Sequence, residues 1–237
     1  MNKLAVVTVH DGHIKELNKT IDSVNNQALK PELHLIVSKK KITTKKKFNF
    51  RKFVIGKDKS IYNAMNIALD LTRNYYVLFL NSGDYFYSNN STKLIKNNIN
   101  KNKKNCLNFV TLLKWERNYY KIKKKIFLQH NFFSHPSFIV PNEKRIKKYD
   151  ENYKILSDGF WMKNNSKIFN FKKIYKTLTV HNLGGISSTP SKISVKDNFK
   201  SSIFEGIKEF IKLLLCLWFN NPKKYYEFIY KNKYSKI

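Results

Sequence analysis

Cysteine is scarce in this sequence of 237 residues, which contains only Cys106 and Cys216. Two cysteines so far apart provide neither the close spacing of a metal site nor the framework of a disulfide-rich domain. This scarcity is typical of a chain that stays in a reducing compartment. We therefore expect a cytoplasmic protein without structural disulfides.

Acidic residues are also few, because 16 Asp and Glu stand against 46 Lys and Arg and give a formal net charge of +30. Such an excess attracts polyanions, which include nucleic acids, anionic lipids and phosphorylated substrates. Much of it lies in scattered lysine- and asparagine-rich tracts (residues 39–47, 96–105 and 121–125) that are typical of solvated surfaces. No known RNA- or DNA-binding motif accompanies them, so we expect no nucleic-acid partner.

Long apolar runs are missing as well. The run at residues 4–9 is too short for the core of a signal peptide and instead predicts a first β-strand. Residues 213–219 are almost wholly apolar, but Lys208 and Lys212 lie just before them, and a membrane span needs about 20 apolar residues. The sequence thus predicts neither a signal peptide nor a membrane-spanning helix.

The hydrophobic content of 42% and the aromatic content of 15% indicate a folded chain with one good core. In the first half, segments with the pattern of strands alternate with segments of helical spacing, which is typical of βαβ units and a mainly parallel sheet. The expected strands are residues 4–9, 33–37, 53–55 and 76–80, and the expected helices are 14–27 and 61–71. After Asp84 the pattern is mixed, with helices at 92–99 and 155–162 and strands at 107–115, 119–127, 137–140 and 167–175.

One stretch indicates a site directly. The apolar residues 76–80 have the composition of a central strand, and Asn81-Ser82-Gly83-Asp84 follows them at once with the chemistry of a turn. In open α/β sheets, ligands bind beyond the carboxyl ends of the strands. The turn could simply end the strand, but its position makes Asp84 a candidate ligand-binding residue.

The last forty residues form a separate segment of the sequence. Apolar residues recur at helical spacing from Phe199 to Leu214, and basic and aromatic residues follow. One interpretation is a helix that lies in the plane of an anionic membrane. The other is a helix that packs on the domain's own core or on a second subunit. We divide the chain into residues 1–190, with halves 1–90 and 91–190, and an amphipathic extension at 191–237.

Several blocks of the sequence, taken in order, resemble family 2 glycosyltransferases of the GT-A fold. They are Val6-Val-Thr-Val-His-Asp-Gly12, Asp58-Lys-Ser-Ile-Tyr-Asn-Ala-Met-Asn66, Phe79-Leu-Asn-Ser-Gly-Asp84, His135-Pro-Ser-Phe138, Tyr149-Asp-Glu-Asn-Tyr-Lys-Ile-Leu-Ser-Asp158 and Gly184-Gly-Ile-Ser-Ser188. The resemblance covers roughly residues 3–190. It implies an α/β protein with a Rossmann-like, mostly parallel central sheet flanked by helices.

The resemblance also implies an activity, which is transfer of a sugar from a nucleotide-diphosphate donor with inversion at the anomeric carbon. Asp84 would then bind Mn²⁺ or Mg²⁺ at the donor diphosphate, since these ions often take only one or two protein carboxylates. Asp158 would be the catalytic base that takes the proton of the acceptor hydroxyl. A capping role at the start of a helix is the alternative interpretation of Asp158.

The same resemblance predicts where the donor and the acceptor bind. The expected donor-binding residues are Thr8, His10, Asp11, Asp58, Asn63, Asn81 and Asp84, with His135 and His181 on the acceptor side. Two departures leave the nucleotide open, although a UDP-sugar is favoured. Lysines follow the second strand where relatives carry an acidic loop, and Ser60 and Asn63 replace the more usual Gly and Asp.

The expected acceptor is a surface glycan, such as capsule, O-antigen or lipooligosaccharide, either free or linked to a lipid. Residues 199–237 would hold the enzyme on the cytoplasmic face of the inner membrane. Two other functions fit parts of the sequence. A catalytically silent relative would bind a membrane or a partner, because the metal motif has one acidic residue instead of two. A basic nucleic-acid-binding protein would account for the charge alone. The oligomeric state stays open.

Overall fold

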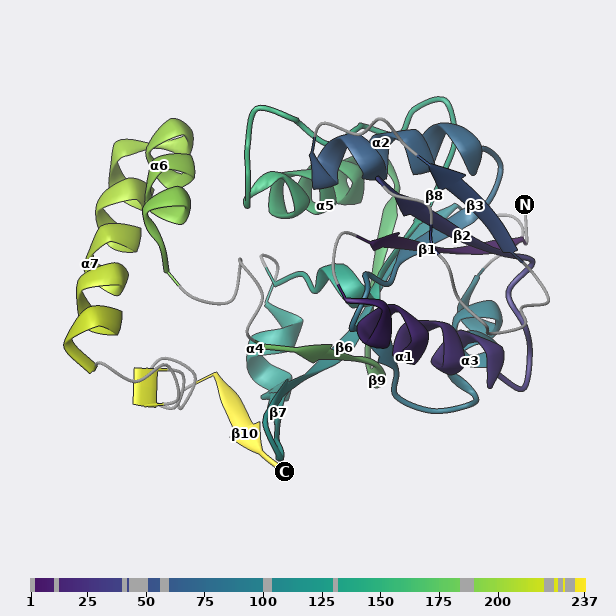
Figure 1. Cartoon of the computed structure of the whole chain (residues 1–237), viewed down its shortest axis with the longest axis horizontal. Helices are drawn as coiled ribbons and strands as arrows, with labels where there is room; N and C mark the ends of the chain where they lie inside the picture. The colour runs from purple at the N-terminus through teal and green to yellow at the C-terminus, as the bar shows by residue number, and fades with distance from the viewer. Residues whose placement is uncertain are drawn as a thin grey trace.

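The computed structural model describes residues 3–10, 13–39, 42, 51–55, 60–99, 104–129, 132–183, 190–219, 224–225, 228 and 233–237, with the backbone alone at 51–55. Within these residues, ten strands form one mixed sheet with helices on both faces (Figure 1). The α/β class and the central sheet flanked by helices are therefore confirmed.

The first half of the chain builds the parallel part of the sheet. Its strands lie in the order β4-β1-β2-β3, each parallel to its neighbour. Helix α1 connects β1 to β2 and α2 connects β3 to β4, as parallel strands require, and the two helices pack on opposite faces of the sheet. These elements are β1 (Leu4–His10), α1 (Ile14–Asn25), β2 (Leu33–Ser38), β3 (Arg51–Ile55), α2 (Ile61–Leu71) and β4 (Tyr76–Phe79).

The second half extends the sheet beyond β4 with mostly antiparallel pairs. Strand β8 lies between β4 and β6, and β7 lies beyond β6. The long strand β9 runs parallel to β6 and also pairs with the short β5. These elements are β5 (Tyr85–Phe86), α3 (Ser91–Asn98), β6 (Asn105–Trp115), β7 (Asn118–Ile122), α4 (Lys124–Leu128), η1 (His135–Ser137), β8 (Phe138–Pro141), α5 (Ser157–Ile168) and β9 (Asn170–Asn182).

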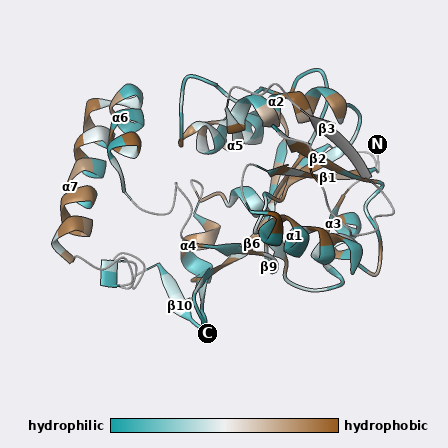
Figure 2. Cartoon of the chain, in the orientation of Figure 1, coloured by the Kyte–Doolittle hydropathy of each residue, from teal (hydrophilic) through white to brown (hydrophobic). Residues whose placement is uncertain are grey.

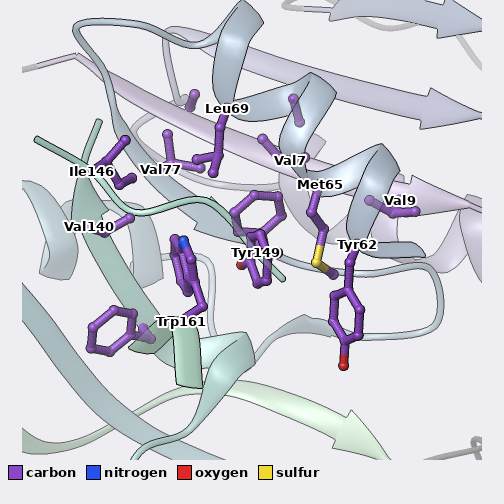
Figure 3. Packing of buried hydrophobic residues seen from close by; sticks show 14 of the residues in the cluster. Val7, Val9, Tyr62, Met65, Leu69, Val77, Val140, Ile146, Tyr149 and Trp161 are labelled. Carbon is purple, nitrogen blue, oxygen red and sulfur yellow. The ribbon is translucent and has the colours of Figure 1, made fainter. Parts of the chain in front are cut away.

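Side chains of β1 alternate between two cores, because successive residues of a strand point to opposite faces. Ala5, Val7 and Val9 pack with α2 and α5 in the core that Figure 3 shows from close by. Leu4 and Val6 pack with residues of α1 and α3 on the other face. The central strands are thus buried on both sides, which explains their continuous apolar runs.

The C-terminal extension forms a helical hairpin and then returns to the sheet. Helix α6 (Lys192–Ser201) packs against α7 (Ile203–Phe219), and the last strand, β10 (Tyr234–Lys236), pairs antiparallel with β7 (Figure 1). A Cβ at Gly206 would lie 2.3 Å from the ring of Phe199, so glycine allows the two helices to approach this closely. Among the described helices, none is long and apolar enough to cross a membrane.

Most element positions match the sequence-based expectations, and the differences have local causes. The strand expected at 119–127 ends at Ile122, and a short helix replaces its second half where lysines interrupt the alternation. The helix expected at 155–162 begins two residues later and continues to Ile168. The strand expected at 167–175 is β9, which begins at Asn170 and runs on to Asn182.

Candidate active site

The turn after β4 is shaped by one glycine and one buried threonine. Gly83 has φ +98, a left-handed conformation that glycine adopts without strain. Its N–H donates to Thr20 Oγ at 3.0 Å, and the Thr20 hydroxyl donates in turn to the carbonyl of Asp84 at 2.7 Å. Helix α1 therefore holds the backbone of the turn in place. Thr20 was not among the predicted site residues.

This turn brings Asp84 against His181 at the end of β9. Asp84 Oδ1 lies 2.7 Å from His181 Nδ1, and the Asp84 side chain is only 7% exposed. Burial lowers the pKa of His181, but the charge of Asp84, its hydrogen bond and the charge of Asp158 outweigh this, so the pKa is raised above 6.5. His181 therefore holds a proton more readily than an ordinary histidine does while it contacts Asp84.

Asp158 lies in the first turn of α5, as the sequence predicted. Its Oδ1 accepts a hydrogen bond from Gly159 N at 2.7 Å. Burial raises the pKa of Asp158 from 3.8 to about 6, against the opposing effects of the backbone N–H groups and of His181. A carboxyl group with this pKa is ionised at neutral pH and accepts protons better than an ordinary aspartate does.

Asp84, His181 and Asp158 all line one cavity of about 380 Å³. Five of the predicted site residues line it: Asn81, Asp84, His135, Asp158 and His181. Its volume falls within the usual range for small-ligand sites. The structure thus brings together the predicted metal ligand, the predicted base and both predicted acceptor-side histidines.

His135 sits on an aromatic wall of this cavity. Its Nε2 lies 2.9 Å from Tyr149 Oη, and its ring stacks on Phe79 with the centroids 5.7 Å apart. Burial lowers the pKa of His135 to about 4, so the ring is neutral at pH 7. Tyr149 in turn stacks on Trp161 at 4.5 Å, both of which appear in Figure 3. The histidine is firmly positioned but uncharged.

Three other predicted donor-binding residues, Thr8, His10 and Asn63, do not line this cavity. Thr8 is fully buried, and its hydroxyl donates to the Leu80 carbonyl at 2.8 Å, which ties β1 to the end of β4. His10 is nearly buried, with Nδ1 3.0 Å from Ser82 Oγ beside the turn. Asn63 on α2 donates to both carboxylate oxygens of Glu151. Asp11 and Asp58 lie outside the described residues.

Two residues of the C-terminal extension also contribute to the site or its support, and no pattern in the sequence pointed to them. Tyr234 of β10 lines the cavity, although it follows Asp158 by a long stretch of chain. Asp197 of α6 is 1% exposed and accepts hydrogen bonds from Lys154 N at 2.6 Å and from Ile155 N at 2.7 Å. It thereby fixes the segment that leads into α5 and Asp158.

The donor set around Asp84 fits a divalent cation of the Mg²⁺ or Mn²⁺ type. Within the described residues, no group of three or more His, Cys, Asp or Glu side chains could hold a metal ion. Such ions need fewer protein ligands where substrate phosphates and water complete the shell. Asp84 and His181 supply a carboxylate and an imidazole. Asn81 Oδ1 lies buried beside them without a hydrogen-bond partner among the described atoms.

No protein-family model matches the sequence, and no curated protein matches it either. Solved structures do resemble the fold. A crystal structure of residues 1–349 of S. aureus TarS in complex with UDP-GlcNAc has a TM-score of 0.66 at 15% identity, over 84% of this chain and 64% of that one. The corresponding UDP complex has a TM-score of 0.62 at 15% identity, over 77% and 61%.

A mannosyltransferase from Pyrobaculum calidifontis, in complex with GDP-Man and Mn²⁺, has a TM-score of 0.58 at 8% identity, over 84% of this chain and 64% of that one. The chain spans about three fifths of the length of these crystallised chains. At such low identity the likeness concerns the fold. The chain has the GT-A fold of nucleotide-sugar-dependent glycosyltransferases.

Proposed function

We propose that this protein is an inverting glycosyltransferase that moves a hexose from a nucleotide-diphosphate donor to a glycan acceptor. The observation that carries the proposal is the single cavity in which Asp84 and His181, at the end of the sheet, meet Asp158 at the start of α5. A family 2-type reaction needs a group that binds the donor diphosphate and a base for the acceptor, and this cavity contains a candidate for each.

The donor is a nucleotide sugar, and we favour a UDP-sugar. TarS was crystallised with UDP and UDP-GlcNAc, and the archaeal mannosyltransferase with GDP-Man and Mn²⁺. By analogy, Asp84 and His181 of this chain would hold Mn²⁺ or Mg²⁺, with the amide oxygen of Asn81 nearby. When bound, the cation offsets the negative charge that the leaving nucleoside diphosphate acquires.

The chain's own residues account for the proton transfer. Ionised Asp158 accepts the proton of the acceptor hydroxyl. At the same time the hydroxyl oxygen bonds to the anomeric carbon, and the bond from that carbon to the diphosphate breaks. Attack from the face opposite the leaving group inverts the anomeric centre. Neutral His135, held by Tyr149 and Phe79, would line the acceptor side of the cavity without adding charge.

The acceptor we propose is a surface glycan of the capsule, O-antigen or lipooligosaccharide type, reached by the enzyme on the cytoplasmic face of an inner membrane. The support comes from α7. Eight of its large apolar side chains are at least 47% exposed: Ile203, Phe204, Ile207, Phe210, Ile211, Leu214, Leu217 and Trp218. At 100° per residue they cover an arc of about 140°. Figure 2 shows the resulting hydrophobic stretches along this helix.

The opposite face of α7 is charged, with Lys208 and Lys212 paired to Glu205 and Glu209. An apolar arc, a charged back and a terminal Trp218 are typical of a helix that lies in a membrane interface. The net charge of +30 complements anionic lipids. A lipid surface therefore fits this face better than a second copy of so basic a chain does.

Vesicle flotation tests the membrane proposal. Leu214→Glu places a charge in the centre of the apolar arc, and we expect it to lower the partition onto anionic vesicles at least tenfold. Asn164→Glu, an exposed position on α5, adds the same charge elsewhere and should have little effect. Deletion of residues 199–237 is a poorer test, because it also removes strand β10 from the sheet. Equal partition of the Leu214→Glu variant and the wild type would contradict membrane docking.

Calorimetry with a panel of nucleotide sugars and Mn²⁺ tests the proposed function. We expect micromolar binding of one UDP- or GDP-sugar that EDTA or the substitution Asp84→Ala abolishes. Asp158→Asn should bind the same donor with similar affinity. A folded protein that binds no nucleotide sugar would contradict the transferase and favour a catalytically silent membrane- or partner-binding relative.

A further inference from the structure

A second cavity, of about 410 Å³, adjoins the catalytic one on the side of the C-terminal hairpin. Phe133, Gly159 and Met162 line both cavities, so the two meet beside Asp158. The second cavity lies between α5 and the α6–α7 hairpin. Its lining is completed by Leu156, Phe160, Lys163, Asn198, Ser201 and Glu205.

The two cavities differ in chemistry. Carboxylate, imidazole, hydroxyl and amide groups line much of the catalytic cavity. In the second cavity, Phe133, Leu156, Phe160 and Met162 supply apolar surface, and the polar side chains come mainly from α6 and α7. Apolar surface exceeds polar surface in the second cavity, so it removes a hydrocarbon chain from water more favourably than it does a sugar ring with its hydroxyl groups.

Helix α6, on one side of the second cavity, is hydrogen-bonded to the segment that leads into α5 on the other side. Asp197, one residue before Asn198, binds the backbone N–H groups of Lys154 and Ile155 just before α5. The hydroxyl of Tyr62 donates to the carbonyl of Ile155, so this segment is held from both sides. Lys200 donates to the carbonyl of Asn152 at 2.8 Å. The space between α5 and α6 is therefore part of the folded structure.

We propose that the second cavity binds an apolar chain attached to the acceptor, so that the acceptor is a lipid-linked glycan whose hydroxyl reaches Asp158 in the first cavity. This inference rests on the proposed function and names the acceptor class for that same site. The shared lining favours this occupant, because an acceptor held beside Asp158 would have its attached chain next to Gly159 and Met162, which also line the apolar cavity. The exposed apolar face of α7, on the same hairpin, would place the second cavity near the membrane in which the lipid-linked glycan is anchored.

Gly159 lies where the linings of the two cavities overlap. A Cβ added there meets no atom within 4 Å, so a larger side chain fits without a clash and occupies this shared region instead. Ser201, an exposed residue at the end of α6, lines only the second cavity. Gly159→Leu and Ser201→Phe should therefore fill the shared region and the second cavity respectively, without loss of the fold.

Methionine-methyl NMR on the full chain tests the proposal. The sequence has three methionines; Met162 lines both cavities, and Met65 is buried in the core as an internal reference. The probes are octyl β-glucoside, below its micelle concentration, and methyl β-glucoside. Each methylene removed from water strengthens binding about fourfold. If three enter the cavity, the octyl compound should bind about sixty-fold more tightly than the methyl compound.

We expect octyl β-glucoside to shift the Met162 methyl signal saturably and to leave Met65 unchanged. Ser201→Phe and Gly159→Leu should each weaken this binding at least tenfold, whereas Lys196→Phe, an exposed α6 position outside the cavity, should not. Equal responses to the two glucosides, or an unchanged response in Ser201→Phe, would overturn the proposal. A Met162 response that Leu214→Glu abolishes and Ser201→Phe leaves intact would assign the chain to α7 and also overturn it.

This measurement is independent of donor binding, so the two proposals fail in different ways. A normal Met162 response in a protein that binds no nucleotide sugar would contradict the transferase. Nucleotide-sugar binding without a chain-length effect at Met162 would contradict the lipid-linked acceptor alone. Once the donor is known, Ser201→Phe should raise KM for a long-chain acceptor at least tenfold and leave kcat for a short-chain acceptor unchanged.

Discussion

Substituting Asn for Asp158 should remove transfer activity and at the same time stabilise the fold. The pKa of Asp158 is raised from 3.8 to about 6, mainly by burial. The native carboxyl therefore keeps its proton to a higher pH than the unfolded one does. Stability falls as the pH rises from about 4 to about 6, and the full penalty for the charged group applies above pH 6.

The size of this penalty follows from the difference between the two pKa values. A difference of about 2 pH units corresponds to about 3 kcal/mol. Solvent reaches part of the Asp158 side chain, which reduces the penalty, so we expect about 1–3 kcal/mol. Asn keeps an oxygen acceptor for Gly159 N, so the substitution changes the charge and little of the local geometry.

Urea unfolding of both proteins at pH 8 and pH 4 measures the effect. The variant should gain about 1–3 kcal/mol relative to the wild type at pH 8, and this gain should shrink toward zero at pH 4. The pH-dependent part is the informative one, because any general effect of the Asn side chain is present at both values. A variant that is less stable than the wild type at pH 8 would refute the reasoning, since it would mean that the fold stabilises the charged carboxylate.

Four further outcomes follow from the same contacts. With the donor known, kcat should fall about tenfold per pH unit below pH 6 as Asp158 takes up its proton, whereas a flat profile to pH 5 would exclude it as the base. In metal-free Asp84→Asn, the pKa of His181 should fall below 6.5, because burial then outweighs the remaining attraction; an NMR titration with no change would contradict their pairing. Asp197→Ala should destabilise the fold by about 2–4 kcal/mol and speed hydrogen exchange of the two amides that it binds, since they stay buried without a partner; unchanged exchange would show that the contact is absent in solution. Gly83→Ala should cost about 1–2 kcal/mol at its positive φ and weaken donor binding, and an unaffected protein would show that the turn tolerates a side chain.

The parallel half of the fold was predictable because its signals are local. Buried strands such as β4 appear as short apolar runs, and amphipathic helices such as α2 appear as periodic ones. The turn after β4 was identifiable from its glycine and from its position at a strand end. Asp84 was a candidate from its position at the strand end, the resemblance added its metal-binding role and pointed to Asp158, and the structure places both residues in one cavity.

Long-range relations were not predictable, because no local pattern encodes them. The pairing of Asp84 with His181 depends on the register of β9 against β5 and β6. Thr8 follows the pattern of a strand-end ligand, but its hydroxyl is used within the fold. The return of β10 to the sheet, which brings Tyr234 to the cavity, depends on the path of the whole C-terminal extension.

The central claim is that one cavity binds the donor through Asp84 and activates the acceptor through Asp158. The most direct test is the release of nucleoside diphosphate from the donor by the wild type, Asp84→Asn and Asp158→Asn, in the presence of acceptor and Mn²⁺. We predict release by the wild type, loss of both binding and release in Asp84→Asn, and intact binding with at least a hundredfold slower release in Asp158→Asn. Unchanged release in either variant would contradict the role given to that residue. Release that survives in both variants would contradict the site itself.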